Sequence, residues 1–470
     1  TASSSLTSAI FQSSEWKTLT SNSEEASGLY PLQRAFVEAC TERLCKPLQY
    51  MFPENIALDD DGVPVNTGLS LLPSKYDVQR FDENIRQELS LADPKEGGGE
   101  FTAVTMIAEC VVDMVSQFCD RARNALSGSG DDGYLKDEFT LTESLQHDRK
   151  VAAIMYTLQT YLRSGPEKTF IAPYRPSASP QHEEAAEMCL TALQPALDEI
   201  DDMVTEVILD PLCRAVNRRL ADVMATMHLG VYMDNSAEGF GEDHAAFVQN
   251  KMSPMYETIA GNILSKFPPP YASIIASKIS AFSIYAFVSN AALVRPLGES
   301  ARLHITQDLA DLELSLEQLV AKGGSSTHLS EISNGKPYAE LRGVRQMLFW
   351  NGLDVKSKSS QEIAKALLRE SWVRDLRPST IIHYMFSVAP TLLSSPHHTK
   401  RVKAEEYAEK LVTLDGSVDH GEEDAWMVTM SCCDAYQQRA TSTGAARDGD
   451  ERIAQILLSL GPELLRRRRH

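Results

Sequence analysis

The sequence predicts an all-α protein, built as an elongated rod of consecutive antiparallel helical bundles. Apolar residues recur at three- and four-residue spacing in nearly every segment, which is the period of an α-helix. No run of five or more residues alternates strictly between apolar and polar side chains, as a half-buried strand does. A chain of 470 residues is long enough for about three domains, so we expect three bundles.

We expect the first bundle over residues 1–165. Thr140 and Glu143 form a T-x-x-E capping box, which predicts the start of its last helix. One glycine and four prolines lie between residues 163 and 182, so we expect a linker or long loop there, because proline breaks a helix. The predicted helices of this bundle cover residues 32–48, 78–89, 104–118 and 140–162.

The second bundle is expected over residues 166–325, and it opens with an unusually long helical pattern. Ser179 suits the N-cap of this helix and Pro180 suits its first position. A helix over about 183–227 would span roughly 70 Å at about 1.5 Å per residue, which is why we expect an elongated molecule. Two prolines should kink this helix or break it into shorter ones: Pro195 and Pro211.

The segment 271–294 is apolar almost all round, and a helix of this kind belongs in the middle of a bundle. Lys278, Asn290 and five serines are too many polar groups for a lipid-facing span, so we predict no transmembrane segment. One helix is expected before it, over 247–263, and another after Gly298. The second should turn a row of leucines inward: Leu303, Leu309, Leu312, Leu316 and Leu319.

A Gly/Ser loop over residues 322–337 predicts the boundary to a C-terminal bundle over 326–470. We find no internal repeat of fixed period, which weakens the alternative of a HEAT- or armadillo-type adaptor. Shorter helices are predicted over 338–350, 360–370, 378–389, 402–414, 422–440 and 451–465.

The charge of the chain excludes some functions. There are 65 Asp and Glu against 45 Lys and Arg, and a net charge of −20 opposes binding to nucleic acid or anionic lipid.

The eight cysteines form no C-x-x-C pair, and no N-x-[ST] site is present, so we expect a reducing, cytosolic compartment. The basic run Arg466–Arg469 fits a native tail, a membrane contact or a partner contact, and the sequence does not choose among them. Because the chain lacks an initiator Met and a basic leader, we expect a piece of a longer protein.

No motif predicts an active site, and we expect no catalytic residue, cofactor or metal ion. Residues 128–133 match G-x-G-x-x-G, but they follow a helix and contain two aspartates that would repel a pyrophosphate, so we expect a solvated loop. His182 begins a zinc-helix pattern, but its second histidine position is Ala186. Structural explanations also suit three further groups: the loop pair His397 and His398; the small thiols Cys432 and Cys433; and the acidic cluster Asp198, Glu199, Asp201 and Asp202.

One motif carries a resemblance. The segment Leu293–Glu299, which reads L-V-R-P-L-G-E, resembles a stretch of the family of conserved oligomeric Golgi complex subunit 5. The likeness extends upstream through the end of the long helical pattern at His228 to Leu44, and downstream to Pro390, so it covers nearly the whole chain. Ser300 and Ala301 replace the Gly-Gly of that family. Further matching positions after the motif are Asp308, Ala310, Glu313 and Leu314.

The resemblance implies the middle and C-terminal portion of a tethering-complex subunit, with stacked helical bundles like those of exocyst, Dsl and GARP subunits. Such a subunit is a scaffold in retrograde intra-Golgi transport that maintains glycosylation, and it is not an enzyme. It implies a cytosolic protein, peripheral at Golgi membranes. The implied partners are other subunits of the complex, particularly subunit 7, with SNAREs, Rab proteins and golgins as wider contacts. The alternative function is an all-α enzyme or regulatory domain whose site is not visible as a motif.

The same motif has two interpretations. Pro296 and Gly298 would break the chain between two helices, Leu297 would anchor this corner, and Glu299 would suit the first turn of the next helix. Arg295 would then pair with a carboxylate of that helix, either Glu313 or Asp308. In the second interpretation, the motif is part of a partner-binding surface.

Overall fold

The computed structural model describes most of the chain, and the contacts within it divide the chain into two compact units. Unit 1 comprises Thr1–Gly128 and Gln146–Ile208, and unit 2 comprises Ser129–Leu145 and Leu209–His470. The described residues are 30–52, 56–58, 64–66, 72–92, 101–128, 130–229, 232, 246–324, 327–354, 357–389, 397, 401–418, 421–443 and 448–468.

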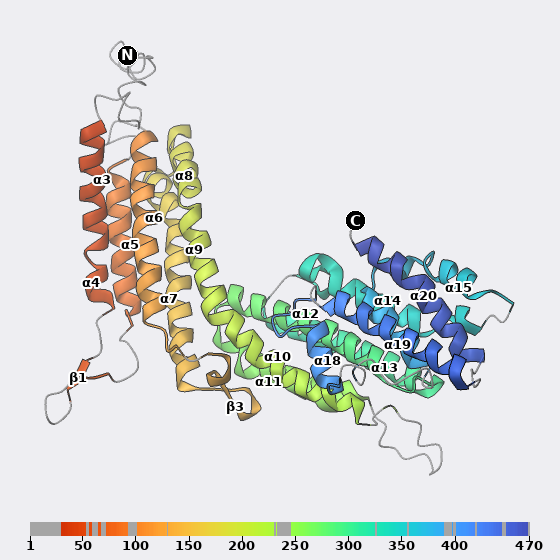
Figure 1. The fold of residues 1–470 in the computed structure, drawn as a ribbon. Helices are drawn as coiled ribbons and strands as arrows, with labels where there is room; N and C mark the ends of the chain where they lie inside the picture. Colours follow the sequence, from red (N-terminus) through yellow and green to blue (C-terminus); the bar gives the residue numbers. More distant parts are fainter. Residues whose placement is uncertain are drawn as a thin grey trace. The chain divides into compact units, whose positions relative to one another are not determined.

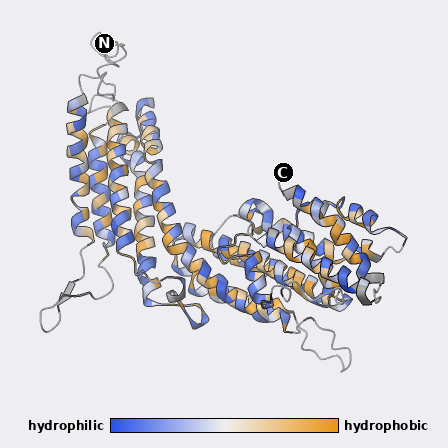
Figure 2. Cartoon of the chain, viewed as in Figure 1, coloured by the Kyte–Doolittle hydropathy of each residue, from blue (hydrophilic) through white to orange (hydrophobic). Residues whose placement is uncertain are grey.

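Unit 1 is a bundle of helices (Figure 1). Its elements are α3 (Tyr30–Cys45), α4 (Leu48–Met51), α5 (Lys75–Ser90), α6 (Phe101–Asn124), most of α7 (Glu143–Pro166), α8 (Pro180–Ala192), α9 (Gln194–Val204) and the short antiparallel strands β1 (Ile56–Leu58) and β2 (Pro64–Asn66). Helix α6 is central, because it packs against α3, α5, α8 and α9. The ring of Phe118 is fully buried there and stacks on Phe81 at a centroid distance of 5.9 Å. Figure 2 shows that hydrophilic and hydrophobic residues share each helix of this unit, as in amphipathic helices.

The fourth helix begins at Glu143, but Thr140 does not cap it, and this part of the prediction was wrong. Thr140 lies in a two-residue strand, β4 (Thr140–Leu141), which pairs with β3 (Leu135–Lys136). The hydroxyl of Thr142 accepts from the Leu145 N–H at 3.3 Å, so the capping residue lies two positions later. Pairing of the strands places Thr140 outside the helix.

The stretch after residue 163 is mostly helical, which corrects the prediction of a loop. Helix α7 continues through Pro166 into a π-helical turn, Glu167–Ile171, and a 3-10 turn, Ala172–Tyr174. Phe170 is fully buried in this stretch, which contacts α5 and α8. Burial of this ring offsets the hydrogen bond that Pro166 removes from the helix.

The long helical pattern is interrupted by a turn at Leu193, before Pro195, and passes through a π-helical turn, Thr205–Leu209, before Pro211. Ser179 and Pro180 open α8, with the Ser179 N–H donating to His182 Nδ1 at 3.1 Å. Pro195 lies in the first turn of α9, and Pro211 lies in the first turn of α10 (Asp210–Ala225). The predicted elongation of the molecule concerns the arrangement of the units and stays a prediction, as do the bundle boundaries near residues 165 and 325.

Unit 2 surrounds one apolar helix, α12 (Pro269–Leu293), which packs against α10, α13, α14, α16 and α18. Every residue of α12 from Ile279 to Leu293 is buried, which confirms its predicted place inside a bundle. By length and composition α12 would be able to cross a membrane, but 72% of its most apolar window is buried inside the structure.

The other elements of unit 2 follow the predicted helices closely. They are η1 (Asp131–Gly133), η2 (Asp137–Phe139), η6 (Thr226–His228), η7 (Val248–Met252), α11 (Ser253–Asn262), η8 (Leu264–Lys266), α13 (Glu299–Lys322), η9 (Leu329–Gly335), α14 (Lys336–Leu348), η10 (Asn351–Asp354), α15 (Ser360–Leu367), η11 (Ser371–Arg374), α16 (Pro378–Val388), α18 (Ala404–Leu411), α19 (Gly421–Thr443) and α20 (Asp448–Arg468). The two strand pairs are short among so many helices, so the all-α prediction is confirmed.

One inward leucine of α13 was predicted wrongly. Leu303 is 54% exposed, whereas the other four predicted leucines are buried. At about 100° per residue, Leu303 lies about 120° around the helix from Leu309, so it faces away from the core. Ala301 and Ile305 are buried in its place.

Candidate functional site

The predicted motif forms a corner between α12 and α13. Leu297 is 5% exposed, and its N–H donates to the carbonyl oxygen of Ser387 at 3.0 Å. Arg295 Nη2 donates to the carbonyl oxygen of Ala389, also at 3.0 Å. Gly298 is the N-cap of α13 and Glu299 lies in its first turn, where a carboxylate suits the helix dipole. These bonds fasten the corner to the end of α16, and a partner-binding role of the motif stays a prediction.

Arg295 does not pair with Glu313 or Asp308, so that prediction was wrong. Glu313 binds Arg345 at 2.7 Å and accepts from the Tyr338 hydroxyl at 2.7 Å. Asp308 is 1% exposed and accepts from the Val248 N–H at 3.0 Å and from a tyrosine hydroxyl. Burial raises the pKa of the Asp308 carboxyl, and these hydrogen bonds lower it in part. Both carboxylates therefore join other helices to α13.

A buried charged network lies at the opposite end of α16, around Arg377. Its guanidinium donates through Nε to both carboxylate oxygens of Glu340, at 2.9 and 2.8 Å. Through Nη2 it reaches the Ser289 hydroxyl at 2.9 Å and the carbonyl oxygen of Tyr285 at 3.1 Å. The side chain of Arg377 is 10% exposed and that of Glu340 is 2% exposed. The network thus joins α12, α14 and the N-cap of α16 in the core of unit 2.

A second buried carboxylate, Glu422 at the start of α19, holds the same end of α16. It accepts from the Ser379 N–H at 2.7 Å and from the Ser379 hydroxyl. Burial raises the pKa of Glu422, and the hydrogen bonds and Arg377 oppose this rise. A cavity of about 740 Å³ borders both carboxylates, and its other charged lining residues are of both signs: Lys336, Arg374, Asp375 and Arg377.

A second cavity of unit 2 is a groove between α10, α12 and α18, which we call the acidic groove. Its cavity has a volume of about 250 Å³. Four carboxylates line it, one from α10 and three from α18: Asp222, Glu405, Glu406 and Glu409. Apolar side chains line the rest of the wall and the floor: Ala221, Ala225, Leu229, Phe282, Ala286, Ala408, Val412 and Leu414.

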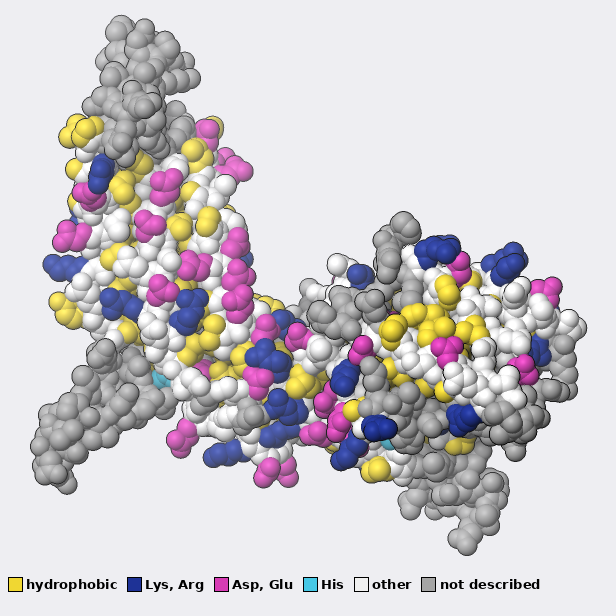
Figure 3. All heavy atoms as spheres, viewed as in Figure 1, with side chains coloured by type: hydrophobic (Ala, Val, Ile, Leu, Met, Phe, Trp, Pro, Cys, Tyr) yellow, Lys and Arg dark blue, Asp and Glu magenta, His cyan; other side chains and the backbone are white. Residues whose placement is uncertain are grey.

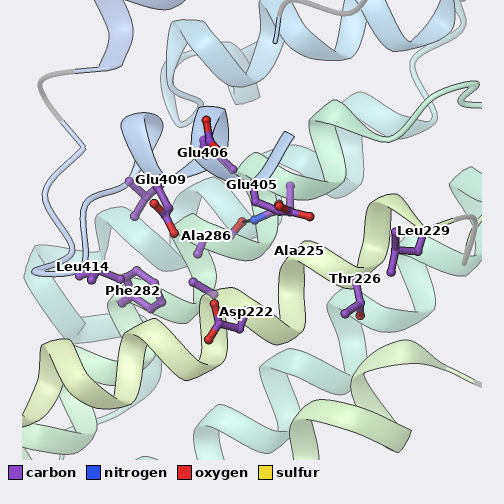
Figure 4. Close-up of a pocket in the computed structure, with 14 residues that line it drawn as sticks. Asp222, Ala225, Thr226, Leu229, Phe282, Ala286, Glu405, Glu406, Glu409 and Leu414 are labelled. Atoms are coloured by element: carbon purple, nitrogen blue, oxygen red, sulfur yellow. Dashed lines mark hydrogen bonds between the residues drawn. The ribbon is translucent and has the colours of Figure 1, made fainter. Parts of the chain in front are cut away.

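The carboxylates and the floor are arranged on different sides of the cavity. Figure 4 shows Asp222 on one side of Phe282 and Ala286, with the three glutamates of α18 on the other side. Phe282 and Ala286 are 1% and 5% exposed, so the floor is firmly part of the core. At one end the Asn290 amide oxygen accepts from His228 Nε2 at 2.9 Å, and the Asn290 amide nitrogen donates to the Ala286 carbonyl at 2.8 Å. Burial lowers the pKa of His228.

The other predicted groups have structural roles in the described part of the chain. Asp131, in the G-x-G-x-x-G segment, binds Arg214 at 2.7 Å, so this segment is fastened to α10. His182 is a capping residue and is 7% exposed. Cys432 and Cys433 are buried, as predicted. The side chains beyond Arg466 in the basic run and His398 lie outside the described residues.

The acidic cluster of α9 forms contacts within unit 1. Glu199 accepts from the Ser116 hydroxyl at 3.0 Å, Asp198 accepts from Gln194 at 2.6 Å, and Asp201 lies 3.7 Å from Arg163. Figure 3 shows acidic side chains along the α8 and α9 edge of this unit. Among the described residues, no group of three or more His, Cys, Asp or Glu side chains is placed to hold a metal ion.

The fold defines the class as an all-α, helical-bundle protein. The chain is similar to conserved oligomeric Golgi complex subunit 5 of Arabidopsis thaliana, with 22% identity over 459 residues that cover 92% of this chain and 45% of the relative. The mouse protein of the same name is 23% identical over 427 residues, covering 90% of this chain and 44% of the relative. The predicted resemblance is confirmed, and the chain spans about half of the length of these curated relatives. The chain matches no family model and no solved structure.

Sequence reasoning missed both the Arg377 network and the acidic groove. Arg377 and Glu340 are 37 positions apart, and neither stands in a motif. Asp222 and Glu409 come from helices separated by most of unit 2. The only sequence signal was local: Glu405, Glu406 and Glu409 lie within one turn of a short predicted helix.

Proposed function

We propose that the chain is part of a scaffold subunit of a Golgi vesicle-tethering complex. Its role would be in retrograde intra-Golgi transport and in the maintenance of glycosylation, as a cytosolic protein peripheral at Golgi membranes. The observation that carries this proposal is similarity over about nine tenths of the chain to subunit 5 from both a plant and a mammal. Two proteins that share their whole helical architecture are similar along nearly all of their helices. Two proteins that share only one site would be similar only near that site.

The structure supports a binding role in preference to catalysis. The buried charged side chains of unit 2 bind one another and the ends of helices, so they stabilise the bundle. A helical scaffold exposes a large surface, and several weak contacts along it give high overall affinity. The partners that follow from the proposal are other subunits of the complex, particularly subunit 7, with SNAREs, Rab proteins and golgins as wider contacts.

The proposal is tested by tagging the endogenous protein that contains this chain and quantifying what co-purifies with it by mass spectrometry. We expect the other subunits of the oligomeric Golgi complex in near-equal amounts. An Arg295→Glu variant tests whether the corner contributes to assembly, and Arg342→Glu, at an exposed position of α14, is the matched charge reversal. Purification of a stable, tagged protein without any of those subunits would refute the proposed function.

A further inference from the structure

The acidic groove combines an apolar floor with a negatively charged rim, and both belong to unit 2. We propose that it binds a basic amphipathic helix of a partner protein. One apolar side chain of this helix enters the cavity, and its Lys or Arg residues face the carboxylates of the rim. That the partner belongs to the Golgi-tethering machinery rests on the proposed function, whereas the binding of a basic helix by the groove does not.

Charge complementarity identifies the occupant as cationic. Among the described residues, none of the four rim carboxylates forms an ion pair, and none of the groove's lining residues is Lys or Arg. Lys251 reaches the edge of the groove, where its Nζ donates to the Thr226 hydroxyl at 3.2 Å and not to a carboxylate. Four like charges around one cavity produce a negative potential that attracts a basic segment and repels an acidic one.

The size of the cavity favours side chains of a larger partner over a free small molecule. Its volume of about 250 Å³ is below the roughly 300–1,000 Å³ of typical small-molecule sites. A space of this size accepts one or two anchoring side chains. Leu229 extends the apolar surface to the rim, where it is 78% exposed.

The direction of the floor favours a helix as the occupant. Phe282, Ala286 and Asn290 lie at successive i, i+4 positions along α12 and all line the groove. Eight residues at about 1.5 Å each make a floor of about 12 Å, or roughly two helical turns. Apolar anchors of an amphipathic helix recur at i and i+3 or i+4, which matches such a length. Glu405 and Glu409, one turn apart on α18, would flank this helix along one side.

The test uses the full chain and a labelled peptide helix with Leu at i, i+3, i+4 and i+7 and with Lys or Arg at its other positions. Binding is measured by fluorescence anisotropy at several salt concentrations. We expect saturable binding that weakens with salt, because three of the four rim carboxylates are exposed and Glu405 is half-buried. A peptide of the same composition in scrambled order keeps the charge but loses the apolar face, and we expect it to bind much more weakly.

Two groups of variants locate the binding. Asp222→Lys with Glu409→Lys reverses the rim and should raise Kd by about tenfold, since two exposed pairs are lost and replaced by repulsion. Glu184→Lys with Glu187→Lys makes the same change in net charge at exposed positions of α8 and should leave Kd unchanged. Ala225→Trp fills the groove without a change in charge and should also abolish binding, with circular dichroism confirming the fold.

Three results would overturn the inference. The first is that the rim and control charge reversals weaken binding equally. The second is that the scrambled peptide binds as well as the amphipathic one. The third is that removal of residues 466–470 strengthens binding tenfold, because this would identify the chain's own basic end as the occupant of the groove. Failure of the proposed function is distinguishable, because the co-purified Golgi-complex subunits would then be missing while the peptide result stands.

Discussion

Removal of the Arg377 guanidinium should be among the most destabilising single changes in unit 2. The Arg377→Met variant keeps most of the aliphatic volume but leaves the Glu340 carboxylate, whose side chain is 2% exposed, without its cation. Thr380 still donates to Glu340 at 2.7 Å, but a neutral hydroxyl does not replace a positively charged guanidinium. Breaking a buried ion pair on one side costs about 3–5 kcal/mol, and we expect a loss of this size.

Part of that loss should return when the carboxylate is neutralised as well. The double variant Arg377→Met with Glu340→Gln removes both charges, so no uncompensated charge stays buried. We expect it to be more stable than the sum of the single losses predicts, by about 1–3 kcal/mol. Glu340→Gln alone completes the double-mutant cycle.

Tryptophan fluorescence during urea unfolding suits this measurement. Three of the four tryptophans, Trp350, Trp372 and Trp426, lie in unit 2, so the signal reports mainly on that unit. The reasoning would be refuted if Arg377→Met cost less than about 1 kcal/mol, the value of an exposed pair, or if the two single losses were additive.

Three other predictions concern unit 2. Burial raises the pKa of Glu422, so its ionised form is disfavoured in the folded state, and protonation stabilises the fold; the stability of the wild type relative to Glu422→Gln, measured by Tm, should therefore rise as pH falls toward 4.5, the ordinary pKa of a glutamate. Burial lowers the pKa of His383 to about 3 from 6.5, so the unfolded chain binds the proton first and stability falls as pH drops below 6.5. His383 Nε2 lies 2.9 Å from the Tyr407 hydroxyl; His383→Gln is able to keep this hydrogen bond and should flatten that part of the pH profile, and an unchanged profile would contradict the assignment. A Cβ at Gly461 would overlap the indole of Trp426, so Gly461→Ala should cost about 1–3 kcal/mol despite the better helix propensity of Ala, and it should shift the tryptophan emission.

The fold class follows from local periodicity, and this explains which elements the sequence predicts well. Helix α12 is apolar on all sides, and its burial follows directly from that composition. The long pattern becomes irregular just before Pro195 and Pro211 because proline acts on its own turn of helix. In each case the physical cause lies within a few residues of the effect.

The errors have tertiary causes. Local composition predicts a loop after residue 163, but burial of Phe170 keeps the chain helical through a proline. Leu303 is apolar yet faces outward, because its angular position on α13 outweighs its residue type. Arg295 was expected to pair within α13, but the corner brings it to the carbonyl at the end of α16. The spacing of residues in the sequence predicts neither which residues contact the corner between α12 and α13 nor which helices form the acidic groove.

The most direct test of the account replaces the matching half of mouse conserved oligomeric Golgi complex subunit 5 with this chain, in mouse cells that lack the subunit. Lectin binding at the cell surface reports the state of Golgi glycosylation, and immunoblotting confirms that the chimera is present at normal abundance. The account predicts that the chimera restores lectin binding and co-purifies with the other subunits. A chimera of normal abundance that recovers neither subunits nor lectin binding would contradict the proposal that this chain is a Golgi-tethering scaffold.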